Sequence, residues 1–258
     1  MLATAFAAPT ELTQATVGGA STTSRRPAAR QTNGLTDGLA AGPARTIDAR
    51  EHLFCEGDRA THVYLVEAGH VCISRLLPDG RRQVIDFAYP GDIIGLGALD
   101  THATSAQATT KTRLRCIPIA TLHDVAARNA GLGRKLYEAL SHELLAAREH
   151  LFTVSQCTAA ERVAAFLLAL SRRNARRGEN PTEIVLPMTR NDIADFLGLT
   201  IETISRTFSK FRADGLIELE HCILVTLLDA DGLADVARGA GASVPSRNYR
   251  PTCRGLSR

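Results

Sequence analysis

The sequence predicts an α+β fold in three successive parts: an antiparallel β-roll, one long helix, and a helical domain that ends in a hairpin. Three patterns support this fold class. Glycines 57, 69, 80 and 91 recur every 11 or 12 residues, which is the turn rhythm of an all-β domain. Apolar residues recur at spacings of three and four between positions 132 and 154, which indicates a long helix. Two short helical patterns then meet at Gly198.

The composition is that of a globular protein with two modest domains. The chain has 258 residues, of which 45% are hydrophobic, and this is ample for packed cores. Its apolar runs are shorter than the roughly 18 residues that a membrane span needs. Its opening lacks the positively charged start of a secretory signal, so we expect a cytoplasmic protein. The net charge is only +3, and any nucleic-acid binding must therefore rest on a local basic surface.

Both ends of the chain are expected to be disordered. Residues 1–45 are rich in Ala, Thr, Gly, Ser and Arg and offer little apolar surface to bury. Because this start is poor in acidic residues, an organellar transit peptide is the alternative interpretation. Residues 238–258 hold five arginines and no acidic residue. They form either a solubilising tail or an arm that binds phosphate without sequence preference.

Residues 46–128 are predicted to form the β-roll, in the manner of a jelly roll. The segments between turns are rich in β-branched and aromatic residues, as in Val63–Val66 and Val84–Phe87, and these residue types favour strands. The turn-forming residues stand at Glu56–Asp58, Ala68–Gly69, Pro78–Gly80 and Pro90–Asp92.

Residues 129–156 are predicted to form a helix with an apolar seam. The seam follows the a and d positions of a heptad repeat, and its residues are Tyr137, Leu140, Leu144, Ala147, Leu151 and Val154. Such a seam would join two copies of the chain as a parallel homodimer. The pattern covers fewer than the three or four heptads that identify a coiled coil, so a helix packed on its own roll is the alternative.

Residues 157–237 are predicted to form a winged helix-turn-helix domain. Thr158 and Glu161 have the spacing of a capping box, and the helix that follows turns four apolar residues inward, Val163, Phe166, Leu167 and Leu170. A basic run between Arg172 and Arg177 ends this helix. These cations either suit the helix dipole or contact phosphate.

Two shorter helices follow in the same domain. Thr189 and Thr200 each suit an N-cap, and Gly198 supplies the tight turn between the helices. The first helix turns four apolar residues inward, Ile193, Ala194, Phe196 and Leu197. A hairpin is expected next, from Leu216–Leu219 and Ile223–Val225. Two helices that meet at a glycine turn and precede a hairpin are typical of a winged helix-turn-helix.

The second helix of this pair has one apolar face, formed by Ile204, Phe208 and Phe211. The opposite face is polar and carries Glu202, Ser205, Arg206, Ser209 and Lys210. An arginine can pair with O6 and N7 of guanine, and a glutamate can accept from N4 of cytosine. Arg206 and Glu202 are therefore the candidate base-reading residues. The alternative is an i,i+4 salt bridge between them on a solvated helix.

The other candidate DNA-binding residues flank this pair. Ser205 and Ser209 are expected to support base reading, whereas Lys210 and Arg190 are expected to position the DNA backbone. Thr189 and Thr200, at the two helix N-termini, complete the candidate set.

Ile201–Arg206, with the pattern Glu-x-x-Ser-Arg, resembles the recognition motif of the Crp/Fnr regulators, specifically the FNR and FixK-like branch. The second specific part of the resemblance is Thr158–Leu168, and the whole extends over about residues 46–228. The resemblance implies a cyclic-nucleotide-binding-like β-roll, a long dimerisation helix and a winged helix-turn-helix. It also implies a homodimer that reads an inverted repeat of the TTGA…TCAA type, contacts RNA polymerase as an activator, and has no enzymatic chemistry.

The sequence predicts neither a cofactor nor a metal. Gly95–Gly97 and Thr104–Ser105 correspond to the phosphate and ribose ligands of the cyclic-AMP receptor but lack its charged partners. An iron–sulfur cluster needs four thiolates, and residues 1–54 contain no cysteine, which favours the FixK-like side of the branch. Two alternatives remain, a sensor that binds a small effector in the roll and a cupin-like metalloenzyme.

The histidines and cysteines show no ligand spacing. His142 and His150, eight residues apart on the long helix, are expected to be solvated. The six cysteines form no C-x-x-C pair, and we expect free thiols. Cys157 is the candidate redox thiol because it lies between the long helix and the helix-turn-helix domain. The alternative is a quiet small residue in a turn.

Overall fold

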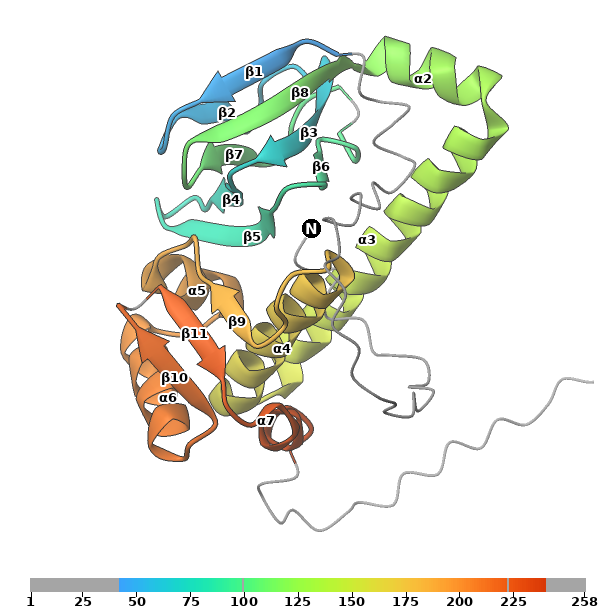
Figure 1. Ribbon diagram of the computed structural model, residues 1–258. Coiled ribbons are helices and arrows are strands. Elements are labelled where there is room, and N and C mark those ends of the chain that lie inside the picture. The colour runs from blue at the N-terminus through green and yellow to red at the C-terminus, as the bar shows by residue number, and fades with distance from the viewer. Residues whose placement is uncertain (1–41, 99, 222, 240–258) are drawn as a thin grey trace, which may run out of the picture.

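The computed structural model describes residues 42–98, 100–221 and 223–239, which form two bodies joined along the long helix α3 (Ala130–Gln156) (Figure 1). The predicted tails lie outside the described residues except at their inner ends. The predicted boundary after residue 45 is wrong, because the first strand, β1 (Ala44–Ile47), already pairs with residues 112–115. At the other end, Arg238 caps the last helix, α7 (Ala230–Ala237).

The roll consists of two four-stranded sheets, with strand orders β1-β8-β3-β6 and β2-β7-β4-β5. Its further strands are β2 (His52–Phe54), β3 (His62–Ala68), β4 (Val71–Leu76), β5 (Arg82–Ala88), β6 (Ile93–Ile94), β7 (Ser105–Ala108) and β8 (Thr112–Pro118). All pairings within the sheets are antiparallel. Buried residues of both sheets share one core, including Ile47, Val66, Val71, Ile94 and Leu114. The predicted antiparallel roll is confirmed.

The four glycines that predict the turns all adopt a left-handed backbone, with φ between 83° and 93°. Gly69 also lies close to a neighbouring turn, because a Cβ there would stand 2.4 Å from the carbonyl oxygen of Lys111. A side chain at this position would therefore be strained by its own backbone and would collide with the chain.

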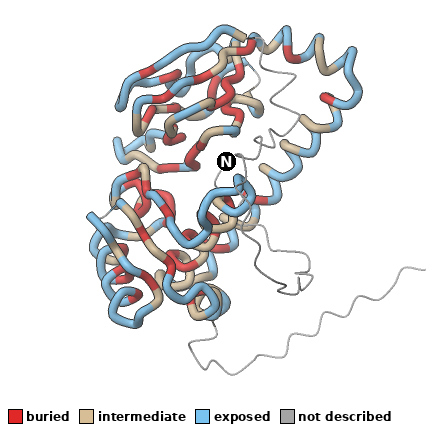
Figure 2. Tube along the Cα trace, viewed as in Figure 1, coloured by how far each residue is buried: buried red, intermediate tan, exposed pale blue. Residues whose placement is uncertain are grey.

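Two helices follow the roll. The sequence patterns do not predict the first, α2 (Ile119–Arg128), which begins without a side-chain cap and buries Leu122 alone. The second, α3, confirms the predicted long helix, and the Asn129 side chain caps it by accepting the Leu132 N–H at 3.1 Å. One face of α3 is buried at intervals, whereas the opposite face is exposed over most of its length (Figure 2). None of the described helices is long and apolar enough to cross a membrane.

The C-terminal domain begins at the capping box, in which Thr158 and Glu161 satisfy each other's backbone N–H groups as predicted. Its elements are α4 (Ala159–Arg176), β9 (Glu183–Val185), α5 (Arg190–Leu197), α6 (Ile201–Ala213), β10 (Ile217–Glu220), β11 (Leu224–Leu227) and α7. The hairpin β10–β11 confirms the predicted wing. The sequence patterns predict neither β9, which adds a third strand to the wing sheet, nor α7.

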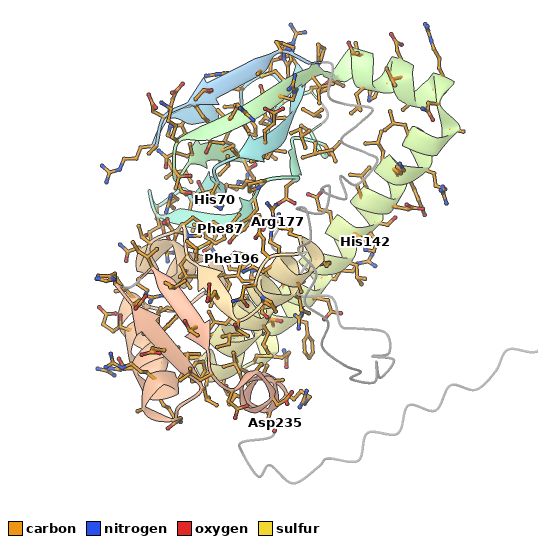
Figure 3. The ribbon with its side chains drawn as sticks, in the orientation of Figure 1. His70, Phe87, His142, Arg177, Phe196 and Asp235 are labelled. Carbon is orange, nitrogen blue, oxygen red and sulfur yellow. The ribbon has the colours of Figure 1, made fainter. Side chains whose placement is uncertain are left out.

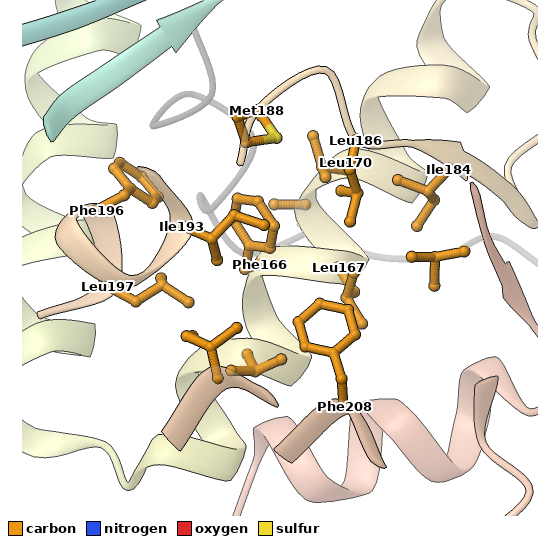
Figure 4. Close-up of a cluster of buried hydrophobic side chains, with 14 of the residues drawn as sticks. Phe166, Leu167, Leu170, Ile184, Leu186, Met188, Ile193, Phe196, Leu197 and Phe208 are labelled. Carbon is orange, nitrogen blue, oxygen red and sulfur yellow. The ribbon is translucent and has the colours of Figure 1, made fainter. Parts of the chain in front are cut away.

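The core of the C-terminal domain lies among α4, α5 and α6, where Phe166, Phe196 and Phe208 are buried together (Figure 4). The same apolar cluster contains Phe87 of β5 and Tyr89, which directly follows β5. A continuous apolar core therefore joins the roll to the C-terminal domain.

Candidate nucleic-acid interface

Local sequence fixes the bend between α5 and α6. The Thr189 hydroxyl caps α5 by accepting the Asp192 N–H at 3.1 Å. Gly198 ends α5 with a left-handed φ of 62°, a conformation that suits a residue without Cβ. The Thr200 hydroxyl then caps α6 by accepting the Thr203 N–H at 3.2 Å. The predicted helix-turn-helix is therefore present.

α6 is divided into a buried face and an exposed face. Ile204, Phe208 and Phe211 are at most 2% exposed and pack into the domain core. The five polar residues predicted to face DNA are all exposed: Glu202, Ser205, Arg206, Ser209 and Lys210. Arg212 in the last turn is exposed as well. The prediction omitted it, although a residue three positions beyond Ser209 lies on the same helical face.

Glu202 and Arg206 attract each other but are not in contact. The backbone N–H of Glu202, the Thr200 hydroxyl and the positive charge of Arg206 hold the pKa of the Glu202 carboxyl below its usual range. Within the described chain no ion pair joins Glu202 to Arg206, so the salt-bridge alternative is not formed. The exposed face therefore presents a carboxylate acceptor and a guanidinium donor about one helical turn apart.

The three remaining candidate DNA contacts lie at helix N-termini. The hydroxyls of Thr189 and Thr200 are engaged as caps. The guanidinium of Arg190, which is half-buried, lies 3.8 Å from the centroid of the Phe208 ring. This cation–π contact holds Arg190 on the domain core, and its contact with a DNA phosphate stays a prediction.

Five of the six seam residues predicted on α3 are exposed, Tyr137, Leu140, Leu144, Ala147 and Leu151. Val154 differs: it is half-buried, and its Cγ1 would lie 3.2 Å from a Cβ built at Gly198. Val154 therefore packs on the turn of its own helix-turn-helix. Leu145 and Phe152 are 45% and 60% exposed. The a and d pattern missed them because they lie one position after seam residues.

Two family models match the chain. Residues 161–236 match a Crp-like helix-turn-helix domain, and residues 44–129 match a cyclic nucleotide-binding domain. The nitrogen fixation regulation protein FixK of Azorhizobium caulinodans is 38% identical over 195 residues, which cover 75% of this chain and 79% of FixK. The chain belongs to the Crp/Fnr family.

Other members of the Crp/Fnr family support the same assignment. The transcriptional activator protein FnrA of Stutzerimonas stutzeri is 35% identical over 198 residues, or 76% of this chain and 81% of FnrA. The solved structure of FixK2 from Bradyrhizobium japonicum has a TM-score of 0.72 and 33% sequence identity, and covers 76% of this chain and 97% of FixK2. The predicted family and fold are confirmed, and the chain is a DNA-binding transcription regulator.

In this Crp/Fnr regulator the basic run at the end of α4 joins the two domains. Arg173 is 9% exposed, and its Nη2 lies 2.6 Å from the Oδ2 of Asp92 in the roll. Its guanidinium also lies 4.3 Å from the centroid of the Tyr89 ring. Arg177 hydrogen-bonds to the carbonyl of Pro90. The sequence analysis predicts that this run either suits the helix dipole or contacts phosphate. It does not predict the contact with the roll.

The expectation that both helix histidines are solvated is wrong for His150. Its ring stacks on Phe196, with centroids 4.2 Å apart. His142, by contrast, is exposed (Figure 3). Burial lowers the pKa of His150. The residue lies on the face of α3 that packs against α5, a contact that helical periodicity alone does not predict.

Cys157 has the environment of a quiet thiol. It ends α3 and is half-buried, and burial, with the neighbouring Glu161 carboxylate, raises its pKa. A raised pKa reduces the thiolate fraction and hence the reactivity. Cys72 lies in the apolar core that joins the two domains. It is buried, and burial raises its pKa to about 12. These environments favour the predicted alternative of an unreactive Cys157.

The residues of the roll do not fit a cyclic nucleotide. At the positions that correspond to phosphate and ribose ligands, the Ser105 hydroxyl accepts the backbone N–H of Glu56 at 2.9 Å, and Gly95–Gly97 offers no charged side chain. The cavity beside Gly95 is about 190 Å³ and mostly apolar, lined by Val63, Leu96, Ile119 and Leu122 among others. Among the described residues, no group of His, Cys, Asp and Glu side chains could hold a metal ion.

Proposed function

We propose that this regulator binds an inverted repeat of the TTGA…TCAA type as a homodimer, without a cyclic nucleotide or an iron–sulfur cluster. The observation that carries the proposal is the exposed polar face of α6, with Glu202 and Arg206 unpaired with each other in its first turns. We propose a cytoplasmic activator that contacts RNA polymerase, because relatives such as FnrA are transcriptional activators. No enzymatic role is proposed.

Base reading follows from the chemistry of the α6 side chains. The N-terminal half of a recognition helix approaches the base edges in the major groove. Arg206 can donate two hydrogen bonds to O6 and N7 of a guanine, and Glu202 can accept one from N4 of a cytosine. Lys210, about one turn beyond Arg206, suits a phosphate because an ammonium is a point charge without directional preference.

Dimerisation explains the exposed apolar face of α3. Tyr137, Leu144 and Leu151 are 72%, 54% and 70% exposed and recur every seven residues, the period at which two helices supercoil. Apolar side chains in such a contiguous stripe mark an interaction surface. A second copy supplies an identical stripe, and the resulting two-fold axis matches the symmetry of an inverted repeat.

The proposed independence from effectors rests on the absence of the side chains that would bind a nucleotide or an iron–sulfur cluster. The roll lacks charged residues at the nucleotide-ligand positions, and residues 1–54 lack the cysteines that a cluster would need. A redox switch at Cys157 is not part of the proposal, because a raised pKa leaves little of the reactive thiolate.

A DNA-binding titration tests the proposal. The purified protein, with no effector added, is titrated in air and with reductant against a TTGA…TCAA duplex and a scrambled duplex at one salt concentration. We expect preference for the specific duplex under both conditions, on the roughly 10³-fold or larger scale of specific protein–DNA complexes. Equal affinity for the two duplexes would contradict the proposal, and binding only with reductant would contradict its independence from thiols.

A companion variant tests the dimer. Leu144→Arg places a charge in the centre of the apolar stripe and should give a monomer by sedimentation, with loss of preference for the inverted repeat. Arg148→Ala, at an exposed position of the same helix, serves as the control and should remain dimeric. A dimeric Leu144→Arg protein would rule out this interface.

A further inference from the structure

Polar side chains of the roll bind α5, the first helix of the helix-turn-helix. The Arg82 guanidinium of β5 hydrogen-bonds to the Asp192 carboxylate of α5 and lies 3.9 Å from Oδ2 of Asp195. The Gln83 side-chain amide donates to the backbone carbonyl of Asp195. The first turn and the middle of α5 are thus attached to the β5 strand above it (Figure 1).

Asp192 is the residue that makes this contact specific. It is 7% exposed, and its Oδ2 already accepts from the Thr189 N–H at 2.9 Å and the Thr189 hydroxyl at 2.7 Å. A carboxylate this deeply buried needs a compensating charge. Arg82 supplies that charge from the other domain, so the cap of α5 and the docking of the domain share one side chain.

An apolar contact beside the polar one removes the remaining freedom of α5. Phe196 meets Phe87 of β5, with ring centroids 5.4 Å apart (Figure 3). The Phe196 centroid also lies 4.2 Å from that of His150 of α3 and 6.0 Å from that of Phe166 of α4. Residues from the roll, the long helix and the C-terminal domain therefore surround one ring. α5 cannot rotate against the roll without breaking both contacts.

The direction of α6 follows from that of α5, because the two helices share a core and a fixed turn at Gly198. In a two-fold dimer, the direction of each recognition helix sets the separation and rotation of the two half-sites that can be read together. We infer that Arg82 is a specificity-determining positioning residue, which sets the half-site spacing accepted by the dimer through its contact with Asp192 and Asp195. This inference rests on the proposed dimeric reading of an inverted repeat.

Spacing is a sensitive readout because one base pair displaces a half-site by about 3.4 Å and rotates it by about 34°. A rigid dimer should therefore bind one spacer length best. A dimer whose domains swivel should accept neighbouring spacers with similar affinity. Neither loss of a phosphate contact nor a modest loss of stability would flatten this profile, because both act equally on all spacers.

The experiment measures Kd for a series of TTGA…TCAA duplexes that differ by single base pairs in the spacer, together with a scrambled duplex. The wild type is compared with Arg82→Gln, Asp192→Asn and the control Arg75→Gln. Asp192→Asn keeps a side-chain oxygen for the α5 cap. Arg75 lies opposite Gln83 on β4, and its partner is Glu56 of the roll rather than a residue of α5.

We expect the wild type and Arg75→Gln to lose roughly tenfold or more in affinity one base pair from the optimum, the scale of a mismatched base pair. Arg82→Gln and Asp192→Asn should lose much less than that between neighbouring spacers, and the double variant should behave like either single one. Affinity for scrambled DNA should be the same in all.

Three results would overturn the inference: an unchanged spacer profile in both variants, an equal loss at every spacer, or tighter binding at the wild-type optimum, which would make the contact inhibitory. Failure of the proposed function is recognised separately, because the wild type would then bind no spacer better than scrambled DNA. If Arg82→Gln does not fold, the comparison rests on Asp192→Asn alone.

Discussion

The two consecutive helices of the DNA-binding domain differ in what surrounds them. α5 is held on its outer side by Arg82, Gln83 and Phe87 of the roll and by His150 of α3. α6 buries one face in the same core, but its polar face is exposed to solvent along its length. From this difference we propose a division of roles, in which α5 fixes the orientation of the pair and α6 reads the DNA.

The physical reason lies in desolvation. Charged groups at α5 are removed from water, and each such group needs a partner within the protein. Polar groups on α6 stay hydrated and can exchange water for the edges of DNA bases. Substitutions at α5 should therefore act on stability and orientation, whereas substitutions on the exposed face of α6 should act on DNA binding alone.

The largest effect is expected for Phe196→Ala at the centre of the α5 contacts. Removal of a fully buried phenylalanine ring should lower the free energy of unfolding by about 3–5 kcal/mol. Denaturant unfolding followed by circular dichroism measures it. Leu76→Ala, at a side chain that is 64% exposed, is the control. A loss at Phe196 no larger than that at Leu76 would contradict the role of α5 as the held helix.

A smaller loss of stability is expected for Arg162→Met. The Arg162 guanidinium donates to the carbonyl oxygen of Leu197 at 2.9 Å and to that of Cys157 at 2.8 Å, and so ties the end of α5 to α4. Loss of these charge-assisted bonds should lower the free energy of unfolding by about 1.5–3 kcal/mol. Arg148→Met, at an exposed position, should change it little. Equal effects at the two arginines would show that Arg162 does not hold α5.

Lys210→Ala should leave stability unchanged and weaken DNA binding evenly. An ammonium that contacts phosphate contributes to specific and random sequences alike. The slope of log K against log salt should become less steep by about 1 for each half-site. Titrations on both duplexes at several salt concentrations check this. A loss confined to the specific duplex would assign Lys210 to base reading.

The smallest effect is a pH dependence at His70. This residue lines a cleft of about 470 Å³ between the domains, together with Tyr89 of the roll and Arg173 and Arg177 of the C-terminal domain. Burial, with Arg173 and Arg177 nearby, lowers the pKa of His70 to about 4. The unfolded chain therefore binds more protons than the folded one between about 6.5 and about 4, so stability falls as the pH decreases through that window. His70→Gln should lose less in melting temperature over this range than the wild type. Parallel curves would show that His70 does not contribute.

The sequence predicts the elements whose signals are local. The caps at Thr158, Thr189 and Thr200 and the turn at Gly198 lie within a few residues of what they organise, and all four are formed. The apolar stripe of α6 predicts its exposed face in the same way, because a helix of known period has only one opposite side. α2 and β9 were missed because they are short and expose most of their residues.

The contact between the domains could not be predicted in this way. Arg82 and Asp192 are 110 residues apart in sequence, and no local pattern shows that a roll arginine meets the cap of a distant helix. Arg173 belongs to the basic run for which the sequence predicts a helix-dipole or phosphate contact, yet it is buried against Asp92. His150 and Val154 follow the same rule, since their partners belong to the helix-turn-helix. Where helical periodicity does not decide which face of an element is buried, the role of a residue depends on its tertiary partners.

The measurement that tests the division of roles most directly is a double-mutant cycle between Arg206 and the guanine of the TTGA half-site. The wild type and Arg206→Ala are each titrated on the TTGA…TCAA duplex and on one in which that guanine is replaced by adenine in both half-sites. If α6 reads the base through Arg206, the replacement should cost the wild type about 1–3 kcal/mol per half-site and cost Arg206→Ala almost nothing. An equal loss in both proteins would contradict the account, because the guanine would then be read by another residue.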